Sequence, residues 1–428
     1  MATRPVEAVV LGAGGRGRQT VGGYARQHPY NLKIVAVAEP DPERRKCFAE
    51  EHNIPPARRY PSWEDLLAQP QMAPALFNTT MDQMHFASTM PALAKGYHVL
   101  VEKPLTTDPV ECVQVVEAAK ARKRILQCGY TLRYAPFFRT VKELVANGTI
   151  GDLITVQHVE HVAYWHMAHS FVRGNWGNAK RCGSPMILSK CCHDLDILRW
   201  IIGRKPVRVA SFGSLTHFTA ARKPAGAPAR CTDGCPVEHE CPYSALKLYL
   251  TLQPTWIADT ISLDTSYDAR RKALETGPYG KCVYQTDNDV VDHQVIILEF
   301  EGGLTVMFTM EGHSHDNVRT MRYSGTAATI RGHAGLNQIS VHHYNSGTTE
   351  QITPGATEGG HGGGDPAMIR EFLEAVRGDD PSGVTASGED SVDSHLLAFA
   401  AEKARRENTV VDFAAYKADI EKQARAKA

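Results

Sequence analysis

The feature that most constrains how this chain folds is a glycine-rich turn close to its start. An apolar run over residues 6–14 ends in Gly12-Ala13-Gly14-Gly15-Arg16-Gly17, and a segment with helical character follows. At a strand-to-helix junction this G-x-G-x-x-G spacing lets the backbone turn tightly at Gly12 and approach a ligand at Gly14. It also lets the helix pack closely on the strand at Gly17. The turn therefore predicts the first unit of a doubly wound α/β sheet.

The rest of the first 130 residues repeats this alternation. Apolar runs rich in Val, Ile and Leu occupy residues 32–40, 75–80, 97–104 and 125–130. Segments with helical character lie between them, at residues 62–69, 83–96 and 108–123. Apolar runs without polar alternation are typical of parallel strands that are covered on both faces. Alternating strands and helices therefore predict an α/β Rossmann domain, built on a doubly wound parallel sheet, over residues 1–133.

The pattern changes from about residue 151. Strands are expected at residues 155–165, 207–218, 293–300 and 304–312, and the Glu-Gly-Gly turn between the last two signals a hairpin. Helices are expected at residues 186–202, 366–377 and 388–407. The pattern predicts an α+β domain over residues 134–428 with a large, mostly antiparallel open sheet. We expect its C-terminal helices to pack back on the Rossmann domain.

Composition excludes some classes of partner. A chain of 428 residues is too long for one ordinary core, which agrees with two domains. Lys plus Arg and Asp plus Glu both number 47, so no net charge favours binding to nucleic acid or to an anionic membrane. No apolar run reaches the length of about 18 residues that a membrane span needs, and the first ten residues lack a signal-peptide core. We expect a soluble, cytoplasmic protein.

The glycine-rich turn and an acidic residue together predict a dinucleotide site. The N-terminus of a helix after such a turn binds a pyrophosphate, because its N–H groups are unpaired and its dipole favours anions. Glu39 ends the second expected strand. A carboxylate there accepts hydrogen bonds from the adenosine ribose diol and repels a 2′-phosphate, which favours NAD. NADP is the alternative, because Arg44 and Arg45 follow closely.

Several further segments carry a family resemblance. The segment VLVEKPLTTD at residues 99–108 follows an NTTMDQMH segment, and GYTLRYAP, IGDL, CCHDLDILRWIIG and YSGTAATIRG lie at residues 129–136, 150–153, 191–203 and 323–332. With them the chain resembles, over essentially its whole length, the Gfo/Idh/MocA family of sugar oxidoreductases. The resemblance implies a Rossmann domain followed by an antiparallel α/β domain, whose open sheet carries substrate residues and often oligomer contacts.

The resemblance also implies roles for residues around the Glu-Lys-Pro tripeptide. In the family, the positions of Asn78, Thr79, Thr80 and His85 line the cofactor cleft, together with Gly15 and Arg16 of the turn. Glu102 is expected near the nicotinamide ribose and Lys103 beside the reacting carbinol. A partly desolvated ammonium next to NAD⁺ has a lowered pKa that suits proton transfer, and in its charged form an ammonium stabilises an alkoxide.

The second half of the expected site lies near residue 190. Active dehydrogenases of the family usually show Asp-x-x-x-His, whereas this chain has Ser189 and His193 at those positions. We expect His193 to act as the acid/base near the hydroxyl. The wider substrate group is expected to include residues from the matching segments: Arg133, Tyr134, Lys190 and Asp194. The predicted reaction is NAD-dependent hydride transfer at a ring carbinol, C3, of a pyranose-type sugar or polyol.

The loss of the aspartate opens a second interpretation. Some relatives are glycoside hydrolases that keep NAD bound and work by transient C3 oxidation, elimination, water addition and re-reduction. The form of the turn with Arg16 and the segment from His361 to Asp365 resemble those of such glycosidases. The extra base and acid would come from Tyr164, His166, His169, His293, His313 and His361. A third interpretation is a sensor that binds NAD and sugar without turnover.

A cysteine cluster stands apart from these motifs. Cys231, Cys235 and Cys241 lie in a Pro-rich loop, and they predict a structural zinc site with a fourth ligand from Cys282, His239 or Cys182. The alternatives are packed reduced thiols or one disulfide.

The expected partners are a small-molecule sugar or glycoside and further copies of the chain. We expect a homodimer or homotetramer through the open face of the second sheet, since an uncovered sheet is an apolar surface.

Overall fold

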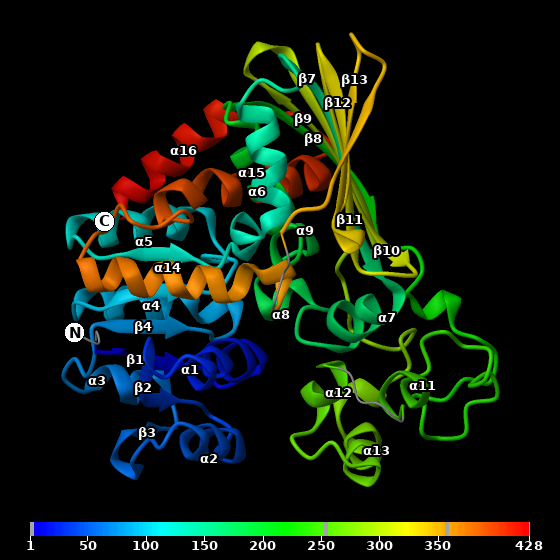
Figure 1. Ribbon diagram of the computed structural model, residues 1–428. Helices are drawn as coiled ribbons and strands as arrows, with labels where there is room; N and C mark the ends of the chain where they lie inside the picture. The colour runs from blue at the N-terminus through cyan, green and yellow to red at the C-terminus, as the bar shows by residue number, and fades with distance from the viewer. Residues whose placement is uncertain (1–3, 252–255, 356–358, 428) are drawn as a thin grey trace.

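The computed structural model describes residues 4–251, 256–355 and 359–427. It contains two sheets, one parallel and one mostly antiparallel, with helices between them (Figure 1). The fold is thus the expected Rossmann domain followed by an α+β domain. Among the described residues, no helix is long and apolar enough to cross a membrane.

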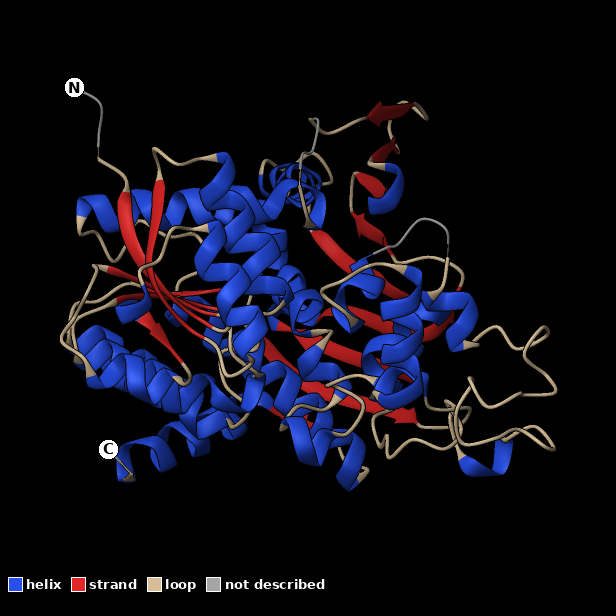
Figure 2. Cartoon of the chain, turned by 90° about the horizontal axis from the view of Figure 1, so that it is seen from below, coloured by secondary structure: helices blue, strands red, loops and turns tan. Residues whose placement is uncertain are grey.

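The first sheet has six parallel strands in the order β3-β2-β1-β4-β5-β6. Their bounds are β1 (Val6–Leu11), β2 (Leu32–Ala38), β3 (Arg59–Tyr60), β4 (Ala75–Asn78), β5 (His98–Val101) and β6 (Leu126–Cys128). The helices are α1 (Gly23–Gln27), α2 (Pro42–Glu51), α3 (Trp63–Ala68), α4 (His85–Ala94) and α5 (Pro109–Ala121), and helices cover both faces of the sheet (Figure 2). The order reverses between β1 and β4, which is where ligands bind in such sheets.

Two glycines of the turn after β1 have no room for a side chain. Gly12 has φ +88°, and a Cβ on it would lie 2.6 Å from the carbonyl oxygen of Thr79. A Cβ on Gly17 would lie 1.9 Å from the carbonyl oxygen of Gly12. The close packing of helix on strand that the spacing predicts is therefore present, although the helix begins with a π-helical segment, Gly15–Gly22, before α1.

The second sheet has nine strands in the order β14-β13-β12-β11-β7-β10-β9-β8-β15. Their bounds are β7 (Leu153–Ala163), β8 (Pro206–Ser214), β9 (His293–Phe300), β10 (Leu304–Ser314), β11 (Val318–Gly325), β12 (Ala328–His333), β13 (Gln338–His343), β14 (Thr349–Ile352) and β15 (Val411–Asp412). All neighbours are antiparallel except β7 and β10. The predicted hairpin is the pair β9 and β10.

Helices fill the space between the two sheets (Figure 1). They are α6 (Pro136–Ala146), α9 (Met186–Ser189), α10 (Cys192–Ile202), α15 (Gly388–Glu407) and α16 (Phe413–Ala426). A further helix, α14 (Gly364–Gly378), packs against β1 of the first sheet. Both α15 and α16 pack against α5 of the Rossmann domain. The prediction of a single helix at residues 186–202 is wrong in one respect. The helix is interrupted at residues 190–191, which separate α9 from α10. The domain boundary at residues 133 and 134 stays a prediction.

The chain between β8 and β9 forms a separate subdomain below the sheet (Figure 1). It carries α11 (Ala245–Tyr249), α12 (Trp256–Ile261) and α13 (Tyr267–Thr276) around a small apolar core of its own, and the sequence patterns did not predict these helices.

Candidate active site

The turn after β1 has the features that a dinucleotide needs. A Cβ on Gly14 or on Gly15 would meet no atom within 4 Å, so this stretch of backbone is open to a ligand. Glu39 is 5% exposed, and its carboxylate accepts hydrogen bonds from the backbone N–H groups of Ala13 (2.7 Å) and Asp41 (3.0 Å). These bonds fix the acid beside the turn, where it can also accept from a ribose diol. The residues present therefore fit NAD.

The two arginines behind the NADP alternative differ in what they contact. The guanidinium of Arg45 donates to the main-chain oxygens of Glu39 and Pro40. Arg44 is half-buried. Burial raises the pKa of Tyr279 of the subdomain, and the charge of Arg44 opposes this rise. The backbone therefore already uses the guanidinium of Arg45 as a hydrogen-bond donor.

The cofactor-cleft residues at the carboxyl end of β4 hold neighbouring segments together. The hydroxyl of Thr79 donates to the carbonyl oxygens of Leu11 and Gly12. Asn78 donates to two hydroxyls of α4, at 2.7 and 3.0 Å, and accepts from the hydroxyl of Thr80 at 2.8 Å. The ring nitrogens of His85 lie 2.6 Å from the carbonyl oxygen of Pro104 and 3.1 Å from that of Thr80. This scaffold ties the end of β4 to the segment that carries Lys103.

Lys103 and His193 come together at the same end of the sheet. The ammonium of Lys103 donates to the main-chain carbonyl of Ser189 at 2.5 Å, and this carbonyl lies at the break between α9 and α10. His193 is 5% exposed and lies edge-on to Tyr130. Burial lowers the pKa of His193 well below its ordinary value, and the charge of Lys103 lowers it further. The site therefore holds a neutral imidazole at His193.

A network of ion pairs joins the glycine-rich turn to the last third of the chain. Arg16 donates to Glu102 at 2.7 Å and to both carboxylate oxygens of Asp365 at 2.9 and 3.1 Å. Asp365 also lies 3.0 Å from Nδ1 of His361. Although burial opposes it, the charge of Arg16 holds the pKa of Asp365 well below its usual range. The ring centroids of His361 and His193 are 5.6 Å apart, so His361 belongs to the same site.

His361 adopts a left-handed backbone conformation, which residues other than glycine rarely adopt. Its φ is +51°, and Gly362 and Gly363 follow at +63° and +84°. Such strain costs about 1–3 kcal/mol and gathers at functional sites, where the surrounding contacts enforce it. Here the contact with Asp365 holds the ring.

A second network lies at the end of β7. Lys190 pairs with Glu160 at 3.0 Å, and Arg319 of β11 pairs with Glu160 at 2.8 Å and with Asp194 at 2.7 Å. His158 binds the same oxygen of Asp194 at 2.9 Å. Burial would raise the pKa of Asp194, but Arg319 and His158 outweigh it and lower that pKa to about 2. The sequence singled out Lys190 and Asp194 and missed Glu160 and Arg319, which lie in strands whose pattern carries no signal for them.

Arg133 and Tyr134 lie away from this group. The guanidinium of Arg133 is buried in a bidentate pair with Asp196, at 2.5 and 2.8 Å, and donates to the carbonyl of Thr385. The hydroxyl of Tyr134 accepts from the side chain of Gln127 and the backbone of Ala386. These contacts tie the start of α6 to α10 and to the segment before α15.

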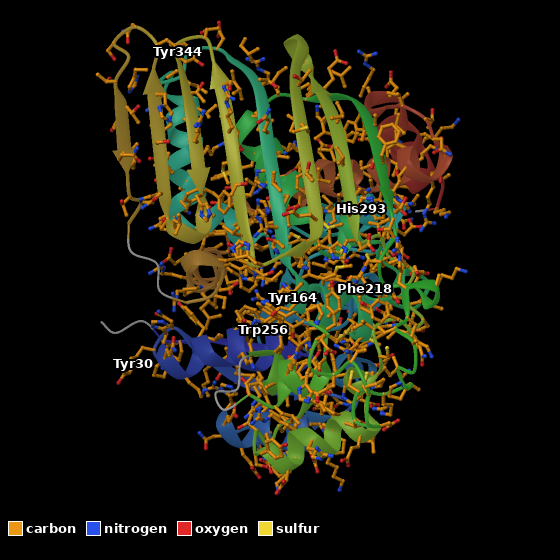
Figure 3. The ribbon with its side chains drawn as sticks, turned by 90° about the vertical axis from the view of Figure 1, so that its right-hand side faces the viewer. Tyr30, Tyr164, Phe218, Trp256, His293 and Tyr344 are labelled. Atoms are coloured by element: carbon orange, nitrogen blue, oxygen red, sulfur yellow. The ribbon has the colours of Figure 1, made fainter. Side chains whose placement is uncertain are left out.

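The remaining histidines fall into two groups. His293 is exposed and binds the buried Asp292 at 2.8 Å, and His313 lies 3.8 Å from the same carboxylate. Figure 3 shows His293 apart from Tyr164 and Trp256. His169 is buried against Tyr249, with its Nδ1 2.8 Å from the tyrosine hydroxyl, and burial lowers its pKa to about 3. None of these three is brought beside His193.

Tyr164 and His166 form the short helix α7 (Tyr164–His166) directly after β7. Nδ1 of His166 lies 3.0 Å from Oδ1 of Asn317. Burial lowers the pKa of His166 well below its ordinary value, and the charges of Lys190 and Lys103 add to this. His166 is therefore a neutral imidazole held by Asn317.

The predicted zinc site is not supported. The pocket around the cysteine loop is lined by Cys231, Cys235, Cys241 and Cys282, and all ten cysteines are free. Within residues 4–251, 256–355 and 359–427, however, no group of three or more His, Cys, Asp or Glu side chains is arranged to hold a metal ion. Burial raises the pKa of Cys241 and of Cys282. Protonated thiols are poor metal ligands, because the thiolate is the form that binds.

Comparisons with known proteins agree with this geometry. Residues 6–130 match the model of the Gfo/Idh/MocA oxidoreductase family described as the NAD-binding Rossmann fold, and residues 142–413 match its C-terminal alpha/beta domain. YteT of Bacillus subtilis (strain 168), whose name describes it as an oxidoreductase, is 23% identical over 80% of this chain and 82% of its own length. Inositol 2-dehydrogenase of Gluconacetobacter diazotrophicus is 29% identical over 40% of this chain and 47% of its own length.

Solved structures share the fold. One is levoglucosan dehydrogenase in complex with NADH and levoglucosan, with a TM-score of 0.69 and 16% identity over 96% of this chain and 100% of that one. The N-terminal domain is therefore an NAD-binding Rossmann domain, and the chain belongs to the Gfo/Idh/MocA oxidoreductase family.

Proposed function

We propose that this protein is an NAD-dependent oxidoreductase that acts on a ring carbinol, C3, of a pyranose-type sugar or polyol. The observation that carries the proposal is the hydrogen bond from Lys103 to the carbonyl of Ser189, four residues before His193. The contact of Arg16 with Glu102 joins the glycine-rich turn to the same segment. The family relatives with named activities include inositol 2-dehydrogenase, which acts on a polyol. Bound NAD⁺ would supply the hydride acceptor at the carbinol carbon.

The side chains have separable tasks in this reaction. Lys103 in its amine form takes up the hydroxyl proton, and the ammonium so formed stabilises the alkoxide. The carbonyl of Ser189 accepts a hydrogen bond from the lysine nitrogen and orients it. His193 stays neutral, so it can accept a hydrogen bond from the substrate hydroxyl or donate one to it. Lys190 and Glu160 form the polar wall on the side of the second sheet. Arg16 fixes Glu102 beside the turn.

The test is a substrate screen that follows NADH absorbance with NAD⁺ and with NADP⁺. The panel holds free hexoses, their 3-deoxy analogues and inositol. We expect NADH to form with at least one free sugar or polyol and not with its 3-deoxy analogue. NADH from a 3-deoxy sugar would contradict the C3 position, and a preference for NADP⁺ would contradict the role of Glu39.

One observation favours a second candidate, redox-neutral hydrolysis of a glycoside. Asp365 holds His361 within reach of His193, which gives the site a further acid/base group that simple carbinol oxidation does not need. Incubation with aryl glycosides separates the two functions. Aglycone release without NADH accumulation would favour the glycosidase, whereas NADH growth on a free sugar without aglycone release would favour the dehydrogenase.

Assembly and location also remain proposals. We propose a homodimer or homotetramer through the open face of the nine-stranded sheet, where Ile297 and Met307 are register partners and are 42% and 40% exposed. The cytoplasmic location stays a prediction, which fractionation of the source cells tests.

A further inference from the structure

An aromatic wall stands beside the candidate active site. It consists of Tyr164, Trp165, His166 and Trp256. Trp165 and Trp256 contact each other at a centroid distance of 6.0 Å, and the ring of His166 contacts both. His166 stacks on Trp165 at a centroid distance of 5.7 Å, and Trp256 meets His166 edge-on at 5.3 Å. Trp256 itself is 44% exposed. Figure 3 shows Tyr164 and Trp256 close together below the second sheet, where the sheet meets the subdomain.

Contacts on its inner side hold Trp256 in place. Besides His166, it meets His169 at 5.2 Å with the two ring planes perpendicular. His169 is in turn stacked on Tyr279 at 4.8 Å and hydrogen-bonded to Tyr249. Several rings hold this tryptophan, and nearly half of its surface is exposed to water. A ligand that covers the exposed indole would gain the free energy of burying apolar surface.

The wall adjoins the residues proposed to bind substrate. Glu160, which pairs with Lys190, lies on β7 four residues before Tyr164, and the wall begins directly after that strand. Asn317 accepts hydrogen bonds from the backbone of Ala163 and from His166, and it lies two residues before Arg319, which pairs with Glu160. The aromatic wall and the candidate active site are therefore both attached to the end of β7 and the start of β11.

The hydrogen bonds at Asn317 also define what His166 offers to a ligand. Because the backbone N–H of Ala163 donates to Oδ1 of Asn317 at 2.8 Å, that atom must be the oxygen. Nδ1 of His166, 3.0 Å from the same oxygen, must then carry its proton. The neutral ring therefore leaves Nε2 as an acceptor for a hydroxyl group.

We infer that the aromatic wall is a subsite for a second sugar ring, so that the preferred substrate is a disaccharide or longer saccharide. A pyranose ring has an apolar C–H face that packs on an indole and a rim of hydroxyls that needs polar partners. Trp256 supplies the apolar platform, and His166 and Asn317 supply polar partners beside it. This inference rests on the proposed function, because it names the substrate class of the same site.

The test compares a monosaccharide with disaccharides. The probes are D-glucose, D-galactose, maltose, cellobiose and lactose, each assayed with the NAD-loaded protein by NADH formation and by calorimetric binding. We expect at least one disaccharide to surpass its monosaccharide by about tenfold or more in kcat/KM and in affinity. Trp256→Ala should remove that advantage through KM with little change in kcat, and Trp256→Phe should keep most of it.

A matched control separates the wall from general surface effects. Tyr30 is 82% exposed and lies far from the wall in Figure 3, so Tyr30→Ala should leave both substrates unchanged. The inference is overturned if no disaccharide binds better than its monosaccharide, or if the advantage survives in Trp256→Ala. A disaccharide that binds through Trp256 without NADH formation would instead contradict the oxidoreductase proposal and leave the subsite standing.

Discussion

At the scale of single residues, the site holds its lysine in an unexpected way. The ammonium of Lys103 is bound by a main-chain carbonyl, that of Ser189, at the position where family dehydrogenases usually have an aspartate. The break between α9 and α10 exposes this carbonyl, which an unbroken helix would have used in its own hydrogen bonds. With serine in place of aspartate, Lys103 keeps a hydrogen-bond partner in the main-chain carbonyl of Ser189. The aspartate carboxylate of the family motif is absent from this position.

The first prediction concerns Lys103. Lys103→Ala should lower kcat by about 10²- to 10⁴-fold, because it removes the proton acceptor and the charge beside the alkoxide. NAD affinity should stay within a few fold, since we propose that the turn and Glu39 hold the cofactor. Steady-state kinetics and a cofactor titration check both parts. Lys46→Ala, at an exposed lysine, is the control. Loss of NAD binding in Lys103→Ala would show that the lysine holds the cofactor.

The second prediction concerns Asp194 and stability. Its folded pKa of about 2 lies below the ordinary value of 3.8, so the ionised carboxylate stabilises the fold above about pH 4. That contribution is lost as the pH falls through the folded value. Asp194→Asn should reduce the free energy of unfolding by about 3 kcal/mol at pH 7, because it leaves Arg319 partly unpaired.

Urea unfolding at several pH values measures this effect. The stability difference between the wild type and Asp194→Asn should narrow as the pH falls from about 4 to about 2. Asp152→Asn, at an exposed carboxylate, should show no such gap. An equal gap at pH 7 and at pH 2 would mean that packing, and not charge, accounts for the loss.

At the scale of elements, the glycine-rich turn gives the third prediction. Gly17→Ala should weaken NAD binding by about tenfold or more, because its Cβ would lie 1.9 Å from the carbonyl oxygen of Gly12 and must displace the helix start. Gly23→Ala is the matched control, since its Cβ meets only the end of Arg26 at 4.0 Å. Alanine in that helix should raise Tm slightly. Calorimetry with NAD and thermal melts check both variants, and equal NAD affinity in the two would contradict the packing argument.

The sequence predicted strands well where burial on both faces produced apolar runs. All of the predicted runs of the Rossmann domain correspond to strands, and the helix predicted at residues 388–407 is α15. Strands β11 to β14 were not predicted, because polar residues such as those at 319, 322 and 331 interrupt their pattern where one face is open to water. The helices of the subdomain are short and pack mostly on one another, which leaves little periodicity in the sequence.

At the scale of the whole molecule, the open face of the second sheet gives the fourth prediction. Ile297 and Met307 pair across β9 and β10, and Phe212 on β8 is 68% exposed. Such a patch favours self-association. Ile297→Glu should convert the proposed dimer or tetramer into smaller species in light scattering after gel filtration. Tyr30→Glu, on the Rossmann domain, should not. A monomeric wild type would contradict the proposal.

The sequence alone determined the cofactor fold and supplied candidates for its key groups. The spacing of Gly12, Gly14 and Gly17 and the acid at Glu39 follow from local rules about turns, strand ends and helix starts. Such rules act within one βαβ unit, so they are readable along the chain. The position of Lys103 was implied by the family resemblance of the Glu-Lys-Pro segment.

The tertiary structure decided which distant residues share the site. Arg16 pairs with Asp365 across nearly the whole chain. The pairing of β7 with β11 brings Arg319 to Glu160, which also pairs with Lys190. The tertiary structure also placed Trp256 of the subdomain against His166. Strand register and helix packing fix these contacts, and both depend on burial over the whole molecule, which a local pattern does not contain.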